Sequence, residues 1–154
     1  MKNYFLFIVV LWFCALNSIA QSDSFPRLTQ EYLMSHKWYP DIYREESRKS
    51  SVMTYTSTQK VDSVFVGSVN TRVNIRDYYL SDTKDTVFDA NKFGNSSSGK
   101  YIIERLRSIN PEKDDLILIR EVVSCSEEKM ELRNLTKGFS SLGYVTTYYT
   151  SPLR

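Results

Sequence analysis

The clearest hydropathy pattern of the chain lies in residues 69–80, where apolar and polar positions alternate. Successive side chains of a β-strand point to opposite faces, so every second residue shares a face. One apolar and one polar face on the same strand are typical of an antiparallel sheet with one buried and one wet side. We therefore expect a strand here with its apolar face buried. That face comprises Val69, Thr71, Val73, Ile75 and Tyr79, and the opposite face comprises Asn70, Arg72, Asn74 and Arg76.

Short segments rich in Tyr, Thr, Ser, Val and Ile continue this strand-like composition along the chain. Turn-forming residues separate them, for example at Gly67-Ser68, Asn110-Pro111 and Gly138. About eight or nine short strands at this spacing predict an all-β sandwich or barrel. Besides residues 69–80, the expected strands are 37–44, 51–58, 61–66, 85–89, 99–107, 115–123, 129–135 and 143–150.

Two segments break the strand pattern. Residues 28–34 place Leu28, Tyr32 and Leu33 on one helical face, which predicts one short helix. Residues 91–99 (NKFGNSSSG) form the longest polar break, and we expect them to be an exposed hairpin connection rather than a domain boundary.

The segment 115–123 is more apolar than the other expected strands. One of its faces comprises Leu116, Leu118 and Val122, and the other comprises Ile117, Ile119 and Val123. Two apolar faces predict a strand that is covered on both sides. The barrel interior would cover one side, and the short helix or a neighbouring molecule would cover the other.

The N-terminus has the features of a secretory signal peptide. A weakly basic start is followed by the apolar run Phe5–Leu16, and small residues precede Gln21. The run is shorter than the roughly 20 apolar residues that a membrane-spanning helix needs. We expect cleavage after Ala20, which leaves residues 21–154 as one secreted or periplasmic domain with no membrane span.

Charge and cysteine content narrow the function classes. The formal net charge of +2 falls to +1 when Lys2 is removed with the signal peptide, and no block of five like charges exists. This gives no electrostatic footprint for nucleic acid. Cys125 is the only cysteine of residues 21–154, which excludes an intramolecular disulfide. Beside an apolar run, Cys125 is expected to be buried or half-buried.

The sequence offers no constellation that predicts catalysis. The sole histidine, His36, has no partners at metal-ligand spacing and is expected at the surface or lightly buried. The acidic pairs Glu45-Glu46, Asp114-Asp115 and Glu127-Glu128 fall at expected turns, where they predict solvated charges. No phosphate-binding loop, serine elbow or zinc helix motif is present. We therefore expect a non-enzymatic protein without a cofactor or metal.

The layout as a whole resembles the lipocalin-like secreted domains of Bacteroidota bacteria. In that family a Trp after the short helix closes one barrel end, and later strands form the wall. The resemblance implies an all-β, antiparallel, eight- to nine-stranded lipocalin-like barrel with a short N-terminal helix. His36 stands in place of the glycine of the lipocalin Gly-x-Trp pattern, so the resemblance implies the architecture alone. The segments that carry it are Leu33–Trp38, Gly99–Ile103, Leu116–Arg120 and Glu127–Leu132.

Aromatic residues are the candidates for binding. The interior of an eight-stranded barrel is either filled by side chains or holds one small ligand. Inward tyrosines would offer a ligand an apolar ring and a hydroxyl, outward ones would suit a protein interface, and ordinary sheet packing would use them equally well. The expected function is binding of a small or partly apolar ligand in the barrel; the alternative is a periplasmic inhibitor, immunity-type protein or envelope-complex subunit that binds a protein partner through its outer surface. The candidate ligand-binding residues are Trp38, Tyr55, Tyr79, Tyr101 and Tyr148.

Overall fold

A computed structural model of the chain describes residues 26–41 and 49–152. The predicted signal peptide and the pair Glu45-Glu46 lie outside these residues. The elements are β1 (Leu28–Thr29), α2 (Gln30–Met34), β2 (Tyr39–Pro40), β3 (Lys49–Tyr55), β4 (Gln59–Val66), β5 (Val69–Ser81), β6 (Ser98–Gly99), β7 (Tyr101–Leu106), β8 (Leu116–Cys125), β9 (Lys129–Asn134) and β10 (Val145–Tyr149).

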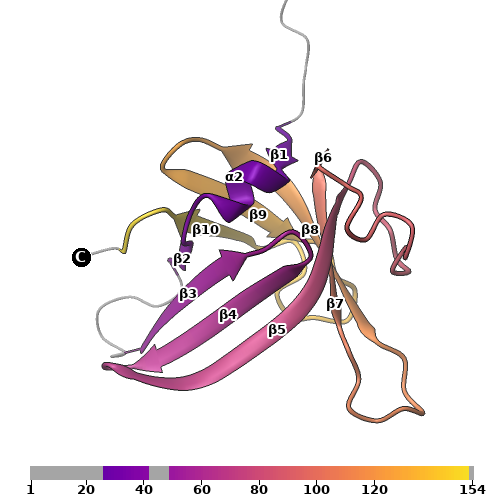
Figure 1. The fold of residues 1–154 in the computed structure, drawn as a ribbon, viewed down its shortest axis with the longest axis horizontal. Helices are drawn as coiled ribbons and strands as arrows, with labels where there is room; N and C mark the ends of the chain where they lie inside the picture. Colours follow the sequence, from indigo (N-terminus) through magenta and orange to yellow (C-terminus); the bar gives the residue numbers. More distant parts are fainter. Residues whose placement is uncertain (1–25, 42–48, 153–154) are drawn as a thin grey trace, which may run out of the picture.

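Eight of these strands form one antiparallel sheet that curls into a nearly closed barrel. Its strand order is β2-β10-β9-β8-β7-β5-β4-β3. In Figure 1, β3, β4 and β5 form the near wall, and β8, β9 and β10 lie behind them. The two edges of the sheet meet where Trp38, next to β2, exchanges backbone hydrogen bonds of 2.9 and 2.8 Å with Met53 of β3. The predicted all-β barrel is therefore confirmed.

The short helix lies across one end of this barrel (Figure 1). It starts where the Thr29 side chain caps the backbone amide of Tyr32, which satisfies one of the free donors of the first turn. Leu33 and Trp38 are both fully buried, and the Trp38 indole N–H donates a 3.1 Å hydrogen bond to the Leu33 carbonyl. The expectation of a helix followed by a buried Trp is confirmed, although the helix itself is limited to Gln30–Met34.

Apolar side chains form two separate clusters, one on each side of the sheet. The inner cluster lies inside the barrel beneath α2 and includes Trp38, Met53, Tyr78, Ile102 and Tyr148. The outer cluster lies on the convex side of β5, β7 and β8. It comprises Tyr79, Ile103 and Ile119, with Phe88, Tyr101, Ile117 and Leu135 packed against it.

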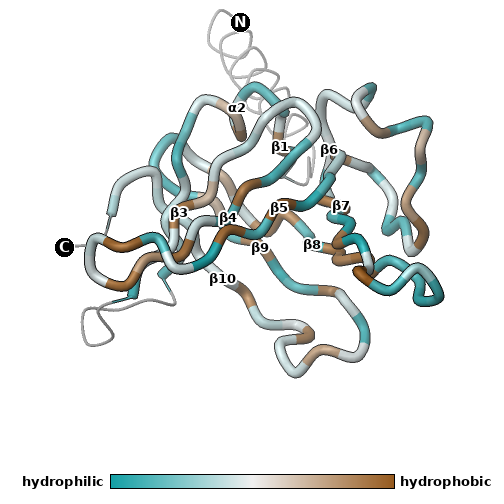
Figure 2. Tube along the Cα trace, turned by 60° about the horizontal axis from the view of Figure 1, so that its bottom comes forward, coloured by the Kyte–Doolittle hydropathy of each residue, from teal (hydrophilic) through white to brown (hydrophobic). Residues whose placement is uncertain are grey.

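The orientation of β5 is opposite to the one that its alternation predicts. Val73 and Ile75 are 51% and 54% exposed, whereas Arg76, on the predicted wet face, points into the barrel and pairs with buried Glu104. Figure 2 shows the alternating hydrophilic and hydrophobic positions along this strand. The expectation was wrong because the second half of the strand decides which face points inward. There Tyr78 and Leu80, which share the face of Arg76, belong to the inner cluster.

The predicted strand 85–89 is also wrong. Residues 82–97 form one long irregular connection beside the barrel, seen to the right of β6 in Figure 1. This connection covers the outer cluster through Phe88. It ends at β6, which pairs with β1 in a separate two-stranded sheet. There Gly99 packs against the backbone of Ser81 so closely that an added Cβ would lie 2.4 Å from the Ser81 nitrogen.

Strand β8 is covered on both faces, as its two apolar faces predict. Leu118 and Val122 are buried inside the barrel, and Ile119 is buried in the outer cluster. The cover on the outer side is the 82–97 connection together with Leu135, not the short helix. Within the described ranges, no helix has the length and apolar character needed to cross a membrane.

Candidate ligand site in the barrel interior

A buried carboxylate organises the charged part of the barrel interior. Glu104 of β7 is 0% exposed, and its two oxygens accept hydrogen bonds from three cations. Lys60 and Arg120 donate to Oε1 at 2.9 and 3.0 Å, and Arg76 donates to Oε2 at 2.8 Å. We name these four residues, Lys60, Arg76, Glu104 and Arg120, the inner charge cluster.

Burial and charge act against each other on this cluster. Burial raises the pKa of Glu104, but the neighbouring charges of Lys60, Arg120 and Arg76 outweigh it and hold that pKa well below its usual range. Burial lowers the pKa of Lys60 to about 8, although Glu104 opposes the shift. Glu104 is therefore ionised at neutral pH, and the cluster holds more positive than negative charge.

The strand register explains why these side chains meet. Tyr55 of β3 lies opposite Lys60 of β4, and Lys60 lies opposite Arg76 of β5. Side chains that face one another across adjacent strands have their Cβ atoms roughly 5 Å apart. On the far side of β5, Tyr78 lies opposite Glu104. One row across the barrel wall thus holds a hydroxyl, an ammonium and a guanidinium, and Glu104 lies diagonally across from Arg76 in the next row.

Two polar atoms of this region are buried without a hydrogen-bond partner among the described residues. They are the Tyr55 hydroxyl and the Nε of Arg76. A buried polar group that lacks a partner costs about 1–3 kcal/mol, so proteins rarely leave such groups unmet. Tyr55 is 5% exposed and lies opposite Lys60 in the strand register, which places it next to the cluster. Burial, followed by the charge of Glu104, raises the pKa of its hydroxyl well above the usual range. The interior therefore offers unused hydrogen-bonding groups beside an excess of positive charge.

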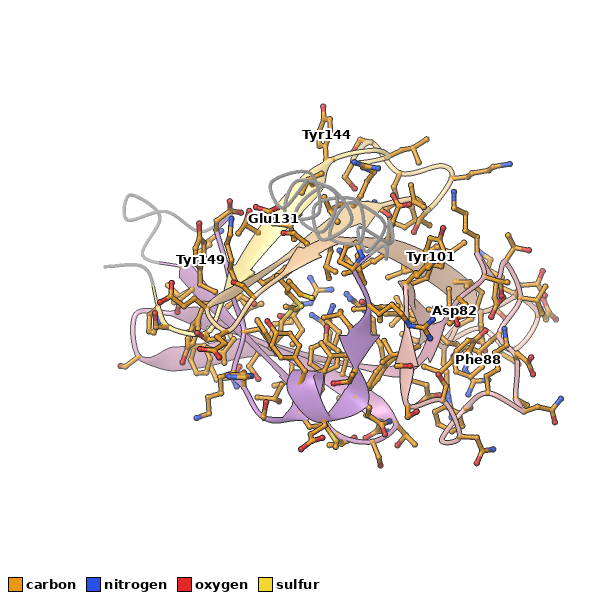
Figure 3. All side chains as sticks on the ribbon, turned by 90° about the horizontal axis from the view of Figure 1, so that it is seen from above. Asp82, Phe88, Tyr101, Glu131, Tyr144 and Tyr149 are labelled. Carbon is orange, nitrogen blue, oxygen red and sulfur yellow. The ribbon has the colours of Figure 1, made fainter. Side chains whose placement is uncertain are left out.

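The structure separates the five candidate residues into two groups. Trp38, Tyr55 and Tyr148 belong to the inner cluster, and the Tyr148 hydroxyl accepts a 3.2 Å hydrogen bond from Arg120. Tyr79 and Tyr101 belong to the outer cluster, so their expected inward orientation was wrong. Tyr101 lies on the same side of the molecule as Phe88 (Figure 3). The error follows from the orientation of β5, which is opposite to the predicted one and turns Tyr78 inward and Tyr79 outward.

The four residues of the inner charge cluster were not among the candidate ligand-binding residues. Charged residues are seldom buried, so a sequence pattern gives them a low weight as interior groups. One signal was present in the chain: Ile102 and Glu104 share a strand face, as do Arg76, Tyr78 and Leu80. Once an apolar residue is placed inside, its charged neighbour two positions away must point inside as well.

A second polar network lies outside the barrel, and its donors and acceptors are paired with one another. Tyr79, Ser81, Thr83 and Lys92 all donate to the Asp85 carboxylate, at 2.9, 3.0, 2.6 and 2.7 Å, and we name these five residues the outer loop network. Burial alone would raise the pKa of Asp85, but the hydrogen bonds from Lys92, Thr83, Tyr79 and Ser81 lower it to about 2. This network fixes the 82–97 connection against the outer cluster.

The outer face also carries an open pocket beside this connection. Its volume is about 620 Å³, and its lining includes Val87, Phe88, Arg105 and Ile117. The Arg105 guanidinium stacks on the Phe88 ring at 4.1 Å. Val87 is 76% exposed, so this rim presents apolar surface to solvent.

The remaining sequence candidates carry no site. His36 is half-buried, as expected, and its ring contacts the rings of Tyr32 and Trp38. Cys125 is exposed, so the expectation that it is buried or half-buried was wrong. The pairs Asp114-Asp115 and Glu127-Glu128 are exposed turn residues. In residues 26–41 and 49–152, no group of three or more His, Cys, Asp or Glu side chains is arranged to hold a metal ion.

Comparisons with known proteins add no identity to this picture. No family model, curated protein or solved structure matches the chain. The fold and the geometry of the interior are therefore the basis for any functional conclusion.

Proposed function

We propose that this protein is a secreted, non-enzymatic, lipocalin-like domain that binds a small, partly apolar ligand inside its barrel. The observation that carries the proposal is the pair of unmet buried groups, the Tyr55 hydroxyl and Arg76 Nε. They lie next to the apolar side chains of the inner cluster. A few convergent polar groups among apolar and aromatic side chains are typical of small-molecule sites.

The barrel architecture supports the same proposal. A nearly closed eight-stranded sheet encloses an interior of the size that holds a single small ligand in other eight-stranded barrels. The interior supplies both kinds of contact that such a ligand needs. Tyr78, Tyr148 and Met53 provide apolar surface, and the inner charge cluster provides hydrogen-bond donors.

Trp38 makes the proposal testable by fluorescence. It is the only Trp of residues 21–154, and it is fully buried in the inner cluster. The secreted chain would be titrated with N-phenyl-1-naphthylamine, a neutral and partly apolar probe, while Trp38 emission is followed. Saturable quenching of Trp38 supports binding in the barrel. A titration that leaves Trp38 emission unchanged, together with no heat of binding by calorimetry, contradicts it.

A protein partner at the outer face is the second candidate, because the exposed Val87 lies on the rim of the outer pocket. Such a partner would bury this apolar rim. The test compares the secreted chain with its Val87→Asp variant as baits in an extract of the native envelope. A partner retained by the wild type and lost with Val87→Asp supports this function, whereas identical capture by both baits contradicts it.

A further inference from the structure

We infer that the ligand of the barrel carries a carboxylate, whose oxygens accept hydrogen bonds from Tyr55 and Arg76 and whose charge is balanced by the inner charge cluster. This inference rests on the proposed function, since it names the chemical class of the ligand for the same interior site. Three observations lead to it: the type of the unmet groups, the excess of charge, and the surrounding rings.

The unmet groups point to an acceptor. Arg76 Nε–H is a donor that cannot accept, and it has no partner among the described residues. The Tyr55 hydroxyl has a proton to donate and is equally without a described partner. The Arg76 Nη1 already donates to Glu104, so a second oxygen at Nε would use the other side of the same guanidinium. A group with two acceptor oxygens meets both demands.

The charge of the interior points to an anion. Lys60, Arg76 and Arg120 surround a single carboxylate within hydrogen-bond distance, that of Glu104. Asp62 shares the inner face of β4 with Lys60, and its carboxylate accepts a 2.6 Å hydrogen bond from Ser51. With Asp62 counted, the three cations of the inner charge cluster still exceed the two carboxylates of Glu104 and Asp62 by one charge. A monocarboxylate brings the missing negative charge.

The side chains around the unmet groups suit an apolar body attached to the carboxylate. The Tyr55 ring packs edge-on against Tyr78, with centroids 5.1 Å apart. Both rings belong to the inner cluster together with Tyr148. A carboxylate at Tyr55 and Arg76 would therefore have aromatic surface directly beside it, where an alkyl or aryl chain gains from leaving water.

Three ligands of matched length test the chemical class. Hexanoate, 1-hexanol and hexylammonium share one chain and differ only in the head group. Each would be titrated into the secreted chain, with Trp38 emission and calorimetry as readouts. We expect hexanoate to bind at least about tenfold more tightly than 1-hexanol, and hexylammonium to bind most weakly, because charge-assisted hydrogen bonds are the stronger ones.

Matched variants locate the carboxylate. Tyr55→Phe removes a hydroxyl that makes no hydrogen bond to a described residue, so the fold is expected to tolerate it. We expect Tyr55→Phe and Arg76→Gln each to weaken hexanoate binding about tenfold and to leave 1-hexanol binding unchanged. Arg105→Gln is the control, because Arg105 bonds to Asp77 and stacks on Phe88 on the outer face.

The outcomes separate this inference from the proposed function. Equal binding of hexanoate and 1-hexanol overturns the carboxylate and leaves barrel binding standing. Failure of every hexyl ligand and of N-phenyl-1-naphthylamine overturns both. A preference for hexanoate that survives in both Tyr55→Phe and Arg76→Gln also overturns the inference, because an ordered water rather than the ligand would then satisfy these two groups.

Discussion

Glu104 and Asp85 are two carboxylates on opposite sides of the same sheet, and they differ in whether the polar groups around them are all paired. Each accepts several hydrogen bonds and is held ionised by cations. Around Asp85 the donors are hydroxyls and one lysine, and they are fully used. Around Glu104 the cations outnumber the carboxylate, and two neighbouring polar atoms are unmet.

This difference separates a structural network from a candidate binding site. A network at the surface whose hydrogen-bonding groups all have partners fixes a loop and needs no further partner. A buried network with unmet donors is costly on its own, and a ligand that completes it relieves that cost. Perturbed ionisation is common to both networks, so it does not by itself identify a functional site. The following predictions test this contrast.

The largest effect is expected from Glu104→Ala. Loss of the buried carboxylate leaves Lys60, Arg76 and Arg120 without their shared anion. Breaking a buried ion pair from one side costs about 3–5 kcal/mol. Urea unfolding at pH 7 measures the change. A loss below about 1 kcal/mol would show that the inner charge cluster is not buried as described.

Acid should weaken the fold through the same carboxylate. The folded pKa of Glu104 lies well below its ordinary value of 4.5, so the unfolded chain binds the proton more readily. Stability from Glu104 is thus complete above about pH 5 and is lost as the pH falls through the folded pKa. The difference between the urea midpoints of wild type and Glu104→Gln, measured from pH 7 to pH 3, should shrink steadily below about pH 5. A constant difference over that range would contradict the account.

Asp85→Asn should have a smaller and more local effect. It weakens charge-assisted hydrogen bonds that fix the 82–97 connection, each worth about 1–3 kcal/mol when one partner is lost. We expect a moderate loss of stability and faster proteolytic cleavage between residues 82 and 97. Glu131→Gln is the control, because its hydrogen bonds lie on the exposed face of β9. Cleavage at an unchanged rate would show that the network does not hold the connection.

Two tyrosines give the finest comparison. Tyr79→Phe removes a hydroxyl that donates to Asp85 and accepts from the Asp89 amide, which should cost about 1 kcal/mol. Tyr55→Phe removes a hydroxyl without a described partner, so its cost without ligand should be near zero or slightly favourable. Thermal melts of the two variants in the same buffer measure this difference. Equal losses would remove the contrast between the two sides of the sheet.

The general fold could be predicted from the chain because strand-forming composition and turn residues repeat along most of it. The two-sided burial of β8 and the buried Trp38 followed from local patterns. The orientation of β5 could not be predicted in the same way. In its first half Val73 and Ile75 are exposed on the outside of the barrel and Arg76 points inside, whereas Leu80, further along the same strand, is buried in the inner cluster.

The candidate site was the least predictable part for the same reason. Tyr55 and Tyr148 were identified as inward rings, but the charged residues between them come from four strands. Their meeting depends on register across β4, β5, β7 and β8, which hydropathy alone does not specify. A buried Lys, Glu and Arg group is built from tertiary pairing, and each member looks like a surface residue when taken singly.

The most direct measurement of the central claim is the Nε–Hε resonance of Arg76 in a ¹⁵N-labelled sample, assigned by its disappearance in Arg76→Lys. The account predicts that hexanoate shifts this proton strongly downfield and slows its exchange with water, while the Nε–Hε resonance of Arg105 stays in place. A resonance of Arg76 that does not move at saturating hexanoate, or a shift that occurs at Arg105 instead, would contradict the claim that the inner charge cluster binds a carboxylate.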